Sequence, residues 1–217
     1  MTLPTLSGPS RPALSGNTKQ LIILLHGLGA DGNDLFGLSD DLAKALPDAA
    51  FASPNAPFAC DMAPWGFQWF SLRDWSEASM LQGVRDAAPI LNAFIDEQKA
   101  KYNLQDNQIA LLGFSQGTMM SLHVALRRAE PLAGVVGFSG AMVAPQNLEK
   151  ELTAKTPICL IHGMVDPVVP FMAMGMAEAA LKAANVPVET HARPMLPHSI
   201  DGEGISAAIV FLKRVLS

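Results

Sequence analysis

A serine between two glycines, directly after an apolar run, constrains this chain more than any other feature. The apolar run Ile109–Leu112 leads into Gly113–Gly117, which reads G-F-S-Q-G, and a helix-forming stretch follows. A strand that turns this sharply into a helix leaves no room for side chains beside the serine, which then takes strained backbone angles. The pattern is typical of a nucleophile elbow, which lifts the hydroxyl of Ser115 above a sheet. A plain Gly/Ser loop between two core elements is the alternative interpretation.

Short apolar runs alternate along the chain with stretches of helical periodicity. The runs are too apolar for a half-solvated sheet, so they predict strands covered on both faces. We expect strands at Leu21–Leu25, Ala50–Ser53, Ile109–Gly113, Gly134–Phe138, Pro157–His162 and Val188–Arg193. We expect helices around Val84–Ile95 (kinked or shifted by Pro89), Gln116–Arg128, Phe171–Ala184 and Glu203–Leu216. This alternation predicts an α/β fold with a mostly parallel central sheet flanked by helices on both faces.

The chain is long enough for one domain with a sizeable core, since it has 217 residues. Residues 1–19 are rich in Pro, Gly and Ser, so we expect a flexible N-terminal tail there and a single domain over residues 20–217. The N-terminal residues lack the cationic start and apolar core of a secretory signal. No apolar stretch approaches the ~18 residues of a membrane span. A cytoplasmic protein is the expectation.

Charge and cysteine content narrow the possible partners. The net charge is −5 and no Lys/Arg cluster stands out, which argues against nucleic acid. The two cysteines are Cys60 and Cys159, and Cys159 lies in an apolar run, where a reduced, buried thiol is expected. No His or Cys pair has ligand-like spacing beside a carboxylate, and no phosphate-binding glycine motif occurs. We therefore expect no metal and no cofactor.

A serine nucleophile needs a base, and an acid must hold that base in one tautomer. Where such an elbow works in a triad, the chain order is serine, acid, histidine, which leaves His191 and His198. His191 lies in the strand-like run Val188–Arg193, so the loop residue His198 is the predicted base; an exposed loop histidine is the alternative. Asp166 follows a predicted strand at the sheet edge where ligands gather, so it is the predicted acid. A helix-capping role for Asp166 before Pro167 is the alternative, and both roles can coexist.

Acyl transfer also requires N–H donors for the oxyanion. One is expected from the residue after the nucleophile, Gln116. The second is expected from the glycine-rich turn His26–Gly29, which follows the strand Leu21–Leu25 and presents the N–H of Leu28. His26 precedes any candidate acid, so it is interpreted as a brace for this turn.

Together these segments resemble the small carboxylesterases, phospholipases and acyl-protein thioesterases of the α/β-hydrolase fold. The resemblance begins at about residue 20 and rests on Leu24–Gly29, Gly113–Gly117, His162–Pro170 and His198–Ser199. It implies a Ser115/Asp166/His198 triad, oxyanion donors at Leu28 and Gln116, and hydrolysis of carboxylic esters or thioesters. The short chain leaves little or no lid domain. Two residues, Thr118 and Pro197, stand where relatives usually have glycine.

The segment Cys60–Phe70 is an aromatic loop punctuated by Gly and Pro. An apolar loop of this kind often covers a ligand site. Pro54–Pro57 followed by Trp69 and Phe70 resembles the family's segment that lines the acyl site. We expect Trp69 to contact the acyl group, with Trp65, Phe70 and Met62 as further substrate-binding residues. A satellite core beneath the loop is the alternative.

The predicted function is therefore a serine hydrolase that cleaves a small-molecule or acyl-carrier ester or thioester through an acyl-serine intermediate. A lysophospholipase-type lipid esterase uses the same chemistry and is the alternative. A slow receptor-type hydrolase is less favoured, because a receptor has no need of a complete triad. A homodimer is a family-style expectation that no surface pattern singles out.

Overall fold

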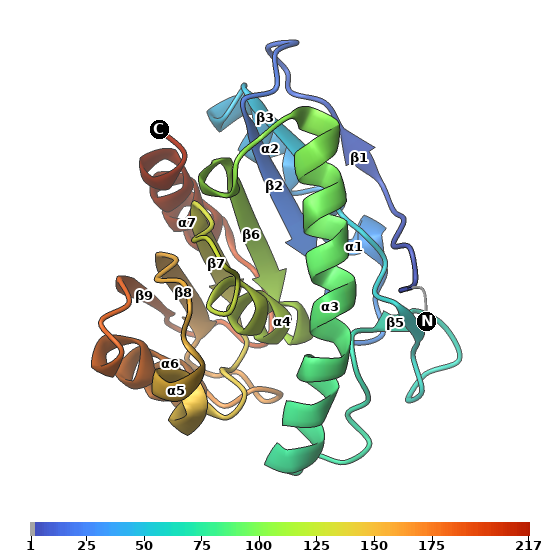
Figure 1. Cartoon of the computed structure of the whole chain (residues 1–217). Helices are drawn as coiled ribbons and strands as arrows, with labels where there is room; N and C mark the ends of the chain where they lie inside the picture. The colour runs from blue at the N-terminus through green and yellow to red at the C-terminus, as the bar shows by residue number, and fades with distance from the viewer. Residues whose placement is uncertain (1–2) are drawn as a thin grey trace.

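A seven-stranded sheet forms the centre of the molecule (Figure 1). The computed structural model describes residues 3–217. The strand order is β1-β3-β2-β6-β7-β8-β9, with β1 antiparallel to β3 and the other neighbours parallel. The strands are β1 (Ser10–Arg11), β2 (Gln20–Leu25), β3 (Ala49–Ala52), β6 (Ile109–Phe114), β7 (Gly134–Phe138), β8 (Ile158–Gly163) and β9 (Val188–Arg193). A separate hairpin consists of β4 (Phe58–Ala59) and β5 (Phe67–Gln68).

Helices cover both faces of the sheet, which confirms the predicted α/β-hydrolase architecture. Side chains alternate between faces along each strand, so Leu21 and Ile23 join one core cluster while Ile22 and Leu24 join the other. On the first face lie α3 (Glu77–Tyr102), α4 (Gln116–Ala125), α5 (Leu148–Glu151) and α6 (Met172–Ala183). On the second lie α1 (Gly32–Phe36), α2 (Ser39–Ala45) and α7 (Gly202–Val215). No helix within residues 3–217 is both long and apolar enough to cross a bilayer.

The six expected strands are all present, with ends shifted by at most one residue. Gly134–Phe138 and Val188–Arg193 agree at both ends. The expected helix around Val84–Ile95 is longer than its apolar stripe and continues as one element through Pro89. Short elements were missed: α1, α2, α5, β1 and the β4–β5 hairpin have too few residues for a periodic pattern to identify them.

The N-terminal segment packs against the domain, which corrects the expected tail for residues 3–19. Strand β1 pairs with β3, in the register Ser10 to Ala52. The backbone N–H of Ser53 donates to the carbonyl of Pro9 at 2.9 Å, and Leu6 is buried in the core. β1 covers only Phe51 and Ala52 of β3, and a two-residue strand in a segment rich in Pro and Gly carries no pattern that would predict it.

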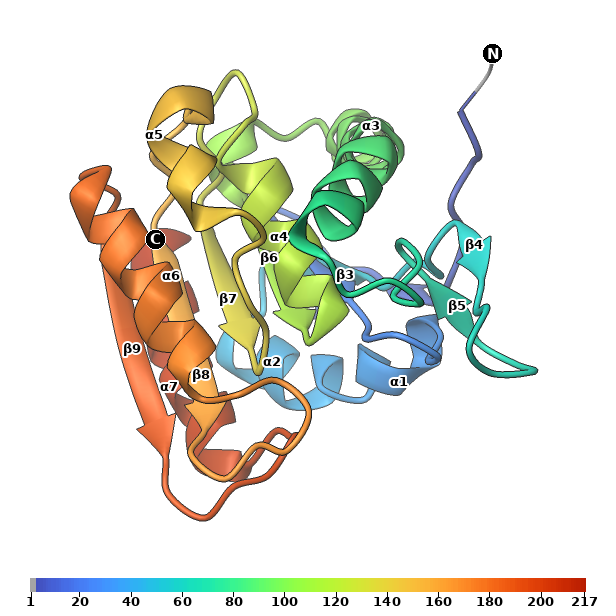
Figure 2. The ribbon, with the colours of Figure 1, turned by 90° about the horizontal axis from the view of Figure 1, so that it is seen from below.

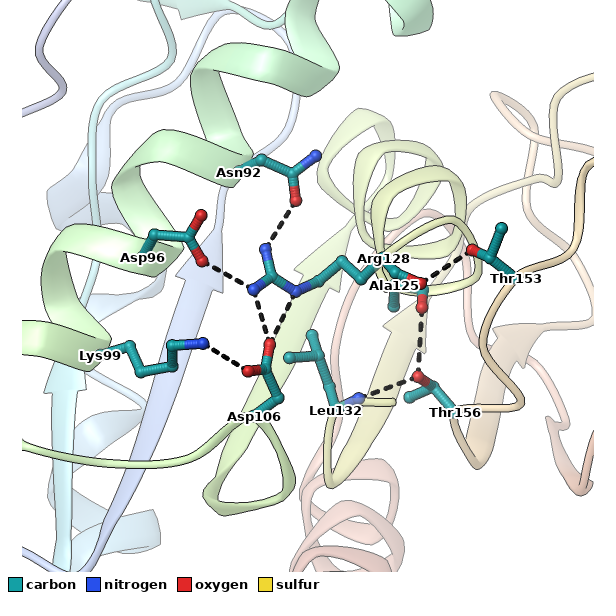
Figure 3. Close-up of polar contacts among 9 residues, drawn as sticks. All are labelled: Asn92, Asp96, Lys99, Asp106, Ala125, Arg128, Leu132, Thr153 and Thr156. Atoms are coloured by element: carbon teal, nitrogen blue, oxygen red, sulfur yellow. Dashed lines mark hydrogen bonds and ion pairs between the residues drawn. The ribbon is translucent and has the colours of Figure 1, made fainter. Parts of the chain in front are cut away.

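An ionic network lies at the amino end of β6, with the side chains of Arg128 and Asp106 largely buried at its centre (Figure 3). Arg128, just after α4, donates to Asp106 at 2.6 Å, to Asp96 at 2.7 Å and to Asn92 at 2.7 Å. Lys99 donates to the second carboxylate oxygen of Asp106. The network therefore connects α3, the segment after α4 and the turn that starts β6. It lies at the amino ends of the parallel strands, opposite to their carboxyl ends.

Candidate active site

The predicted catalytic and oxyanion residues all follow the carboxyl ends of parallel strands. Figure 2 views the molecule from the side toward which the strand arrows of Figure 1 point. Ser115 follows β6, Asp166 follows β8, His198 follows β9 and Leu28 follows β2. Because parallel strands end at the same edge of a sheet, residues far apart in the sequence meet there.

The turn at Ser115 has the geometry that the two glycines predict. Ser115 has φ 54° and ψ −116°, a conformation that costs about 1–3 kcal/mol and needs support from its surroundings. A Cβ on Gly113 would lie 2.5 Å from the carbonyl of Gly117, and one on Gly117 would lie 1.9 Å from the Leu25 carbonyl oxygen. The Ser115 N–H donates to the Phe138 carbonyl at 2.9 Å, which fixes the turn against β7.

The two departures from the family pattern both contribute backbone contacts. The buried hydroxyl of Thr118 lies 2.9 Å from the Gly113 carbonyl and 2.8 Å from the Phe138 carbonyl, at the ends of β6 and β7. A Cβ on Gly163 would lie 2.5 Å from the Pro197 carbonyl oxygen, so the end of β8 packs directly on the loop that carries His198.

Asp166 and His198 meet as the sequence predicted. The Nδ1 atom of His198 lies 2.7 Å from Oδ2 of Asp166. The other oxygen of Asp166 accepts the N–H groups of Val168 at 2.8 Å and Val169 at 2.9 Å, so the aspartate also caps its own turn. Burial raises the pKa of Asp166, but hydrogen bonds from His198, Val168 and Val169 lower it by more. The pKa of Asp166 is therefore below its ordinary value. The anion therefore holds His198 with Nδ1–H toward it and Nε2 free to accept a proton.

A second histidine, His162, supports Asp166 and was not among the predicted site residues. His162 is buried at the end of β8, and its Nε2 lies 2.9 Å from the Val169 carbonyl and 3.3 Å from Oδ2 of Asp166. Its ring also meets the edge of Phe171. The available signal was its position: a histidine at a strand end, four residues before the candidate acid.

The predicted oxyanion donors are free to bind a ligand. Neither the Leu28 N–H nor the Gln116 N–H has a hydrogen-bond partner within residues 3–217. Gly27 packs directly on the nucleophile turn, since a Cβ there would lie 3.3 Å from the Cβ of Ser115. Two unpaired N–H groups beside a raised serine are the arrangement that stabilises an oxyanion.

The β4–β5 hairpin holds the Leu28 turn in place. The Gly29 N–H donates to the Phe67 carbonyl at 2.8 Å, and the Phe67 N–H donates to the Ala30 carbonyl at 2.8 Å. The side-chain amide of Gln116 accepts the Trp69 N–H at 2.9 Å and donates to the Phe70 carbonyl at 2.8 Å. The side chain of one candidate oxyanion donor thus anchors the hairpin that supports the other.

His26 braces the same turn, as the sequence predicted. It is fully buried, its Nδ1 lies 2.7 Å from the Gly27 carbonyl, and its Nε2 accepts the Ala56 N–H at 3.0 Å. Burial lowers the pKa of His26, and the Gly27 hydrogen bond and the carboxylates of Asp34 and Asp31 offset this only in part. A neutral imidazole that uses both nitrogens in fixed hydrogen bonds is not available for proton transfer.

The predicted substrate loop is placed differently from the expectation. Trp69 is fully buried, so it offers no surface to an acyl chain. Phe70 is 3% exposed and lines a separate cavity of about 380 Å³ between the hairpin and the start of α3. The indole N–H of Trp69 donates to the His26 carbonyl at 3.1 Å, so this tryptophan belongs to the satellite core that was the alternative. Trp65 and Met62 lie in the segment between β4 and β5 and are 74% and 54% exposed. A contact of these two with substrate stays a prediction.

A cavity of about 300 Å³ lies beside His198. Its walls come from Asp34 and Leu35 of α1, Leu38 before α2, Phe114 of β6 and the loop 198–200. The rings of Phe114 and His198 are 4.8 Å apart between centroids, tilted by 44°. Phe114, the residue before the nucleophile, thus forms a wall shared by the serine turn and this cavity.

One group of metal-type ligands occurs among residues 3–217, and it lies away from the triad. Cys159 on β8 and Glu189 and His191 on β9 have ligand atoms within 4.8 Å of one another. Spacing along the chain missed this grouping, because pairing of two strands brings the three residues together. Glu189 already pairs with Arg214, and burial together with Glu189 raises the pKa of the Cys159 thiol to about 12. The cysteine is thus buried and protonated, as expected.

Comparison with known proteins gives the family. The profile of the phospholipase/carboxylesterase family matches residues 13–216, so the chain belongs to that family of α/β-hydrolase enzymes. It is 29% identical to Esterase YpfH of Escherichia coli K12, over 97% of this chain and 87% of that protein. It is also 29% identical to acyl-protein thioesterase 1 of Aspergillus fumigatus, over 94% of this chain and 91% of that protein.

Solved structures agree. Esterase PE8 superposes with a TM-score of 0.94 at 40% identity, covering 98% of this chain and all of that one (100%). SOBER1 of Arabidopsis thaliana superposes with a TM-score of 0.80 at 27% identity, covering 92% of this chain and 100% of that one. The protein is a carboxylic ester hydrolase of the esterase and thioesterase type.

Proposed function

We propose that Ser115, Asp166 and His198 form a catalytic triad that hydrolyses carboxylic esters or thioesters through an acyl-serine. The observation that carries this proposal is the Asp166–His198 hydrogen bond of 2.7 Å beside a strained serine turn. That bond fixes the tautomer, because Nδ1 donates to the carboxylate and Nε2 is left as the base.

In the first half-reaction the Ser115 oxygen attacks the substrate's carbonyl carbon while Nε2 of His198 takes the hydroxyl proton. The negative charge that develops on the carbonyl oxygen is stabilised by the free N–H groups of Leu28 and Gln116. Collapse of this intermediate breaks the bond to the leaving alcohol or thiol, which receives the proton from His198. Water then attacks the acyl-serine by the same route and releases the acid.

The substrate class follows from the family and from the absence of a lid unit over this edge among residues 3–217. The relatives include an esterase and acyl-protein thioesterases, so a small-molecule or acyl-carrier ester or thioester is the substrate we propose. A lysophospholipase-type lipid esterase uses the same groups, and the family's name makes it the second candidate. Both cysteines are free thiols, which suits the reducing cytoplasm we propose as its compartment.

Replacing the nucleophile tests this proposal. Ser115→Ala is expected to lower ester turnover by about 10⁴-fold or more, because the acyl-enzyme cannot form. A fluorophosphonate probe is expected to label the parent once, at Ser115, and not the variant. Ser206→Ala, at an exposed hydroxyl of α7, is the matched control and should keep both labelling and turnover.

Three outcomes separate the alternatives. Residual turnover within tenfold of the parent would rule out Ser115 as the nucleophile. Labelling at Ser115 without measurable turnover on any ester or thioester would identify a receptor-type hydrolase. A series of p-nitrophenyl esters, the corresponding thioesters and lysophosphatidylcholine, compared by kcat/KM, distinguishes the esterase from the lipid esterase.

A further inference from the structure

An exposed carboxylate without a hydrogen-bond or ion-pair partner among residues 3–217 lines the cavity beside His198. Asp34 lines it from the first turn of α1, and no hydrogen bond or ion pair to its side chain occurs within residues 3–217. Its neighbour Asp31 caps α1 by accepting the Asn33 N–H at 2.7 Å, so the cap of this helix does not need Asp34. No lysine or arginine among the described residues lines the cavity. The side chain of Asp34 is therefore solvent-exposed and has no protein counter-ion among these residues, so a cationic ligand in the cavity can approach it.

The position of the cavity relative to His198 indicates which part of a substrate enters it. Nδ1 of His198 is committed to Asp166, so the proton delivered to the leaving group comes from Nε2. Proton transfer needs the leaving atom within about 3 Å of that nitrogen. The group attached to the leaving atom is therefore held next to the imidazole. His198 is part of the wall of the cavity of about 300 Å³, a size typical of small-ligand sites.

The remaining walls determine the chemistry of that group. Phe114 contributes an aromatic ring, and Leu35 and Leu38 contribute apolar surface. A carboxylate together with an aromatic ring is a combination that binds ammonium groups, through charge attraction and through the electron-rich face of the ring. An anionic leaving group, such as a phosphate-bearing alcohol or thiol, would be repelled by Asp34.

We propose that this cavity is a leaving-group subsite in which Asp34 selects esters of cationic alcohols, those that carry an ammonium or quaternary ammonium group. The inference rests on the proposed triad, because it assigns the cavity through the proton that His198 delivers. It names Asp34 as the specificity-determining residue and Phe114 as its aromatic partner. It also disfavours leaving groups that carry phosphate without a cation, such as the coenzyme A of its thioesters.

The test compares two esters of the same size. Butyrylcholine is paired with its neutral isostere, in which carbon replaces the quaternary nitrogen. The parent is expected to favour butyrylcholine by about tenfold in kcat/KM, from the ring and the carboxylate together. In Asp34→Asn this ratio is expected to fall to about threefold or less, and added NaCl should lower the ratio in the parent. Glu97→Gln removes one exposed charge from α3, far from the cavity, and should leave the ratio unchanged.

Three results would overturn the proposal. They are a ratio near one in the parent, a ratio that Asp34→Asn does not change, and a preference that appears only when the quaternary ammonium is moved to the acyl side. A second measurement separates this proposal from the proposed function. Calorimetric titration of Ser115→Ala with choline and with its neutral isostere should show binding of choline alone, and Asp34→Asn in that background should abolish it. Choline binding without hydrolysis of either ester would contradict the triad and not the cation site.

Discussion

Two aspartates of equal burial lie at opposite edges of the same sheet and have different partners. Asp106 and Asp166 are each 9% exposed. Asp106, before β6, is bound by the permanent cations Arg128 and Lys99 (Figure 3). Asp166, after β8, is bound by two backbone N–H groups and by the histidines His198 and His162, with no Lys or Arg among its partners in the described chain.

The difference in partners separates a structural carboxylate from a catalytic one. Burial raises the pKa of both groups, but their partners lower it by more, so both carboxyls are ionised. The charge of Asp106 is neutralised at all times. The charge of Asp166 has no permanent counter-ion, so it is available to stabilise an imidazolium that exists only during the reaction.

For the comparison of these two aspartates, the largest effect is expected from Asp166→Asn. An asparagine amide can donate to Nδ1 and so favours the tautomer in which Nε2 carries the proton, which removes the base. Turnover should fall by about 10³- to 10⁴-fold, with little change in the free energy of unfolding. Steady-state kinetics and urea unfolding of the same preparation measure both. A variant within tenfold of the parent would show that Asp166 is not the triad acid.

Asp106→Asn should have the opposite profile. It leaves the buried guanidinium of Arg128 without its main counter-ion, so the free energy of unfolding should fall by about 3 kcal/mol while folded protein keeps its turnover. Asp41→Asn, at an exposed pair with Lys44, is the control and should change stability by less than about 1 kcal/mol. Loss of turnover in properly folded Asp106→Asn would contradict the assignment of a purely structural role to Asp106.

His123 extends the comparison, because it is a buried histidine that lies near cations and not against an aspartate. Burial and the nearby Arg127 lower the pKa of His123 to about 4. The unfolded chain therefore takes up a proton near pH 6.5 that the folded chain refuses, so stability is full above that pH and falls as the pH drops toward about 4. The expected loss by pH 4.5 is roughly 2 kcal/mol. His123→Leu should remove this dependence, measured as the difference between urea titrations at pH 7 and pH 4.5. If the free energy of unfolding changes by the same amount between pH 7 and pH 4.5 in parent and variant, His123 is not the group responsible.

The smallest effect is expected from Trp69→Phe. The change removes one buried hydrogen bond, to the His26 carbonyl, and should lower the free energy of unfolding by about 1 kcal/mol. Because Trp69 supports the Leu28 turn and touches no acyl chain in this arrangement, kcat/KM should fall by a similar factor for short and long esters. A loss confined to long acyl chains would restore the predicted acyl contact.

The sheet and the core of the site were predictable because local patterns determine them. Buried parallel strands are continuous apolar runs, and β7 and β9 were located to the residue. Ser115, Asp166 and His198 could be chosen because strand ends gather at one edge, and chain order removed most competitors. The Asp166–His198 contact then agrees with the predicted pair.

What escaped prediction depends on contacts between distant segments. Trp69 is buried because Gln116 and His26, more than forty residues away in sequence, bind its backbone and its indole. Strand β1 forms because it can pair with the exposed edge of β3. His162 contacts the candidate acid because the turn after β8 brings Asp166 back to the end of that strand. Asp34 was not singled out because its significance lies in having no partner, which a sequence cannot show.

The anchoring of the hairpin by Gln116 has a consequence for how this enzyme can be diversified. The backbone is fixed at Phe67, Trp69 and Phe70, whereas Met62, Pro64 and Trp65 between β4 and β5 are exposed to solvent. Length and composition of that tip can therefore vary without moving the Leu28 turn. Libraries randomised over residues 62–65 are a route to new substrate profiles at low risk to the catalytic geometry, whereas changes at Gln116 would disturb hairpin and site together.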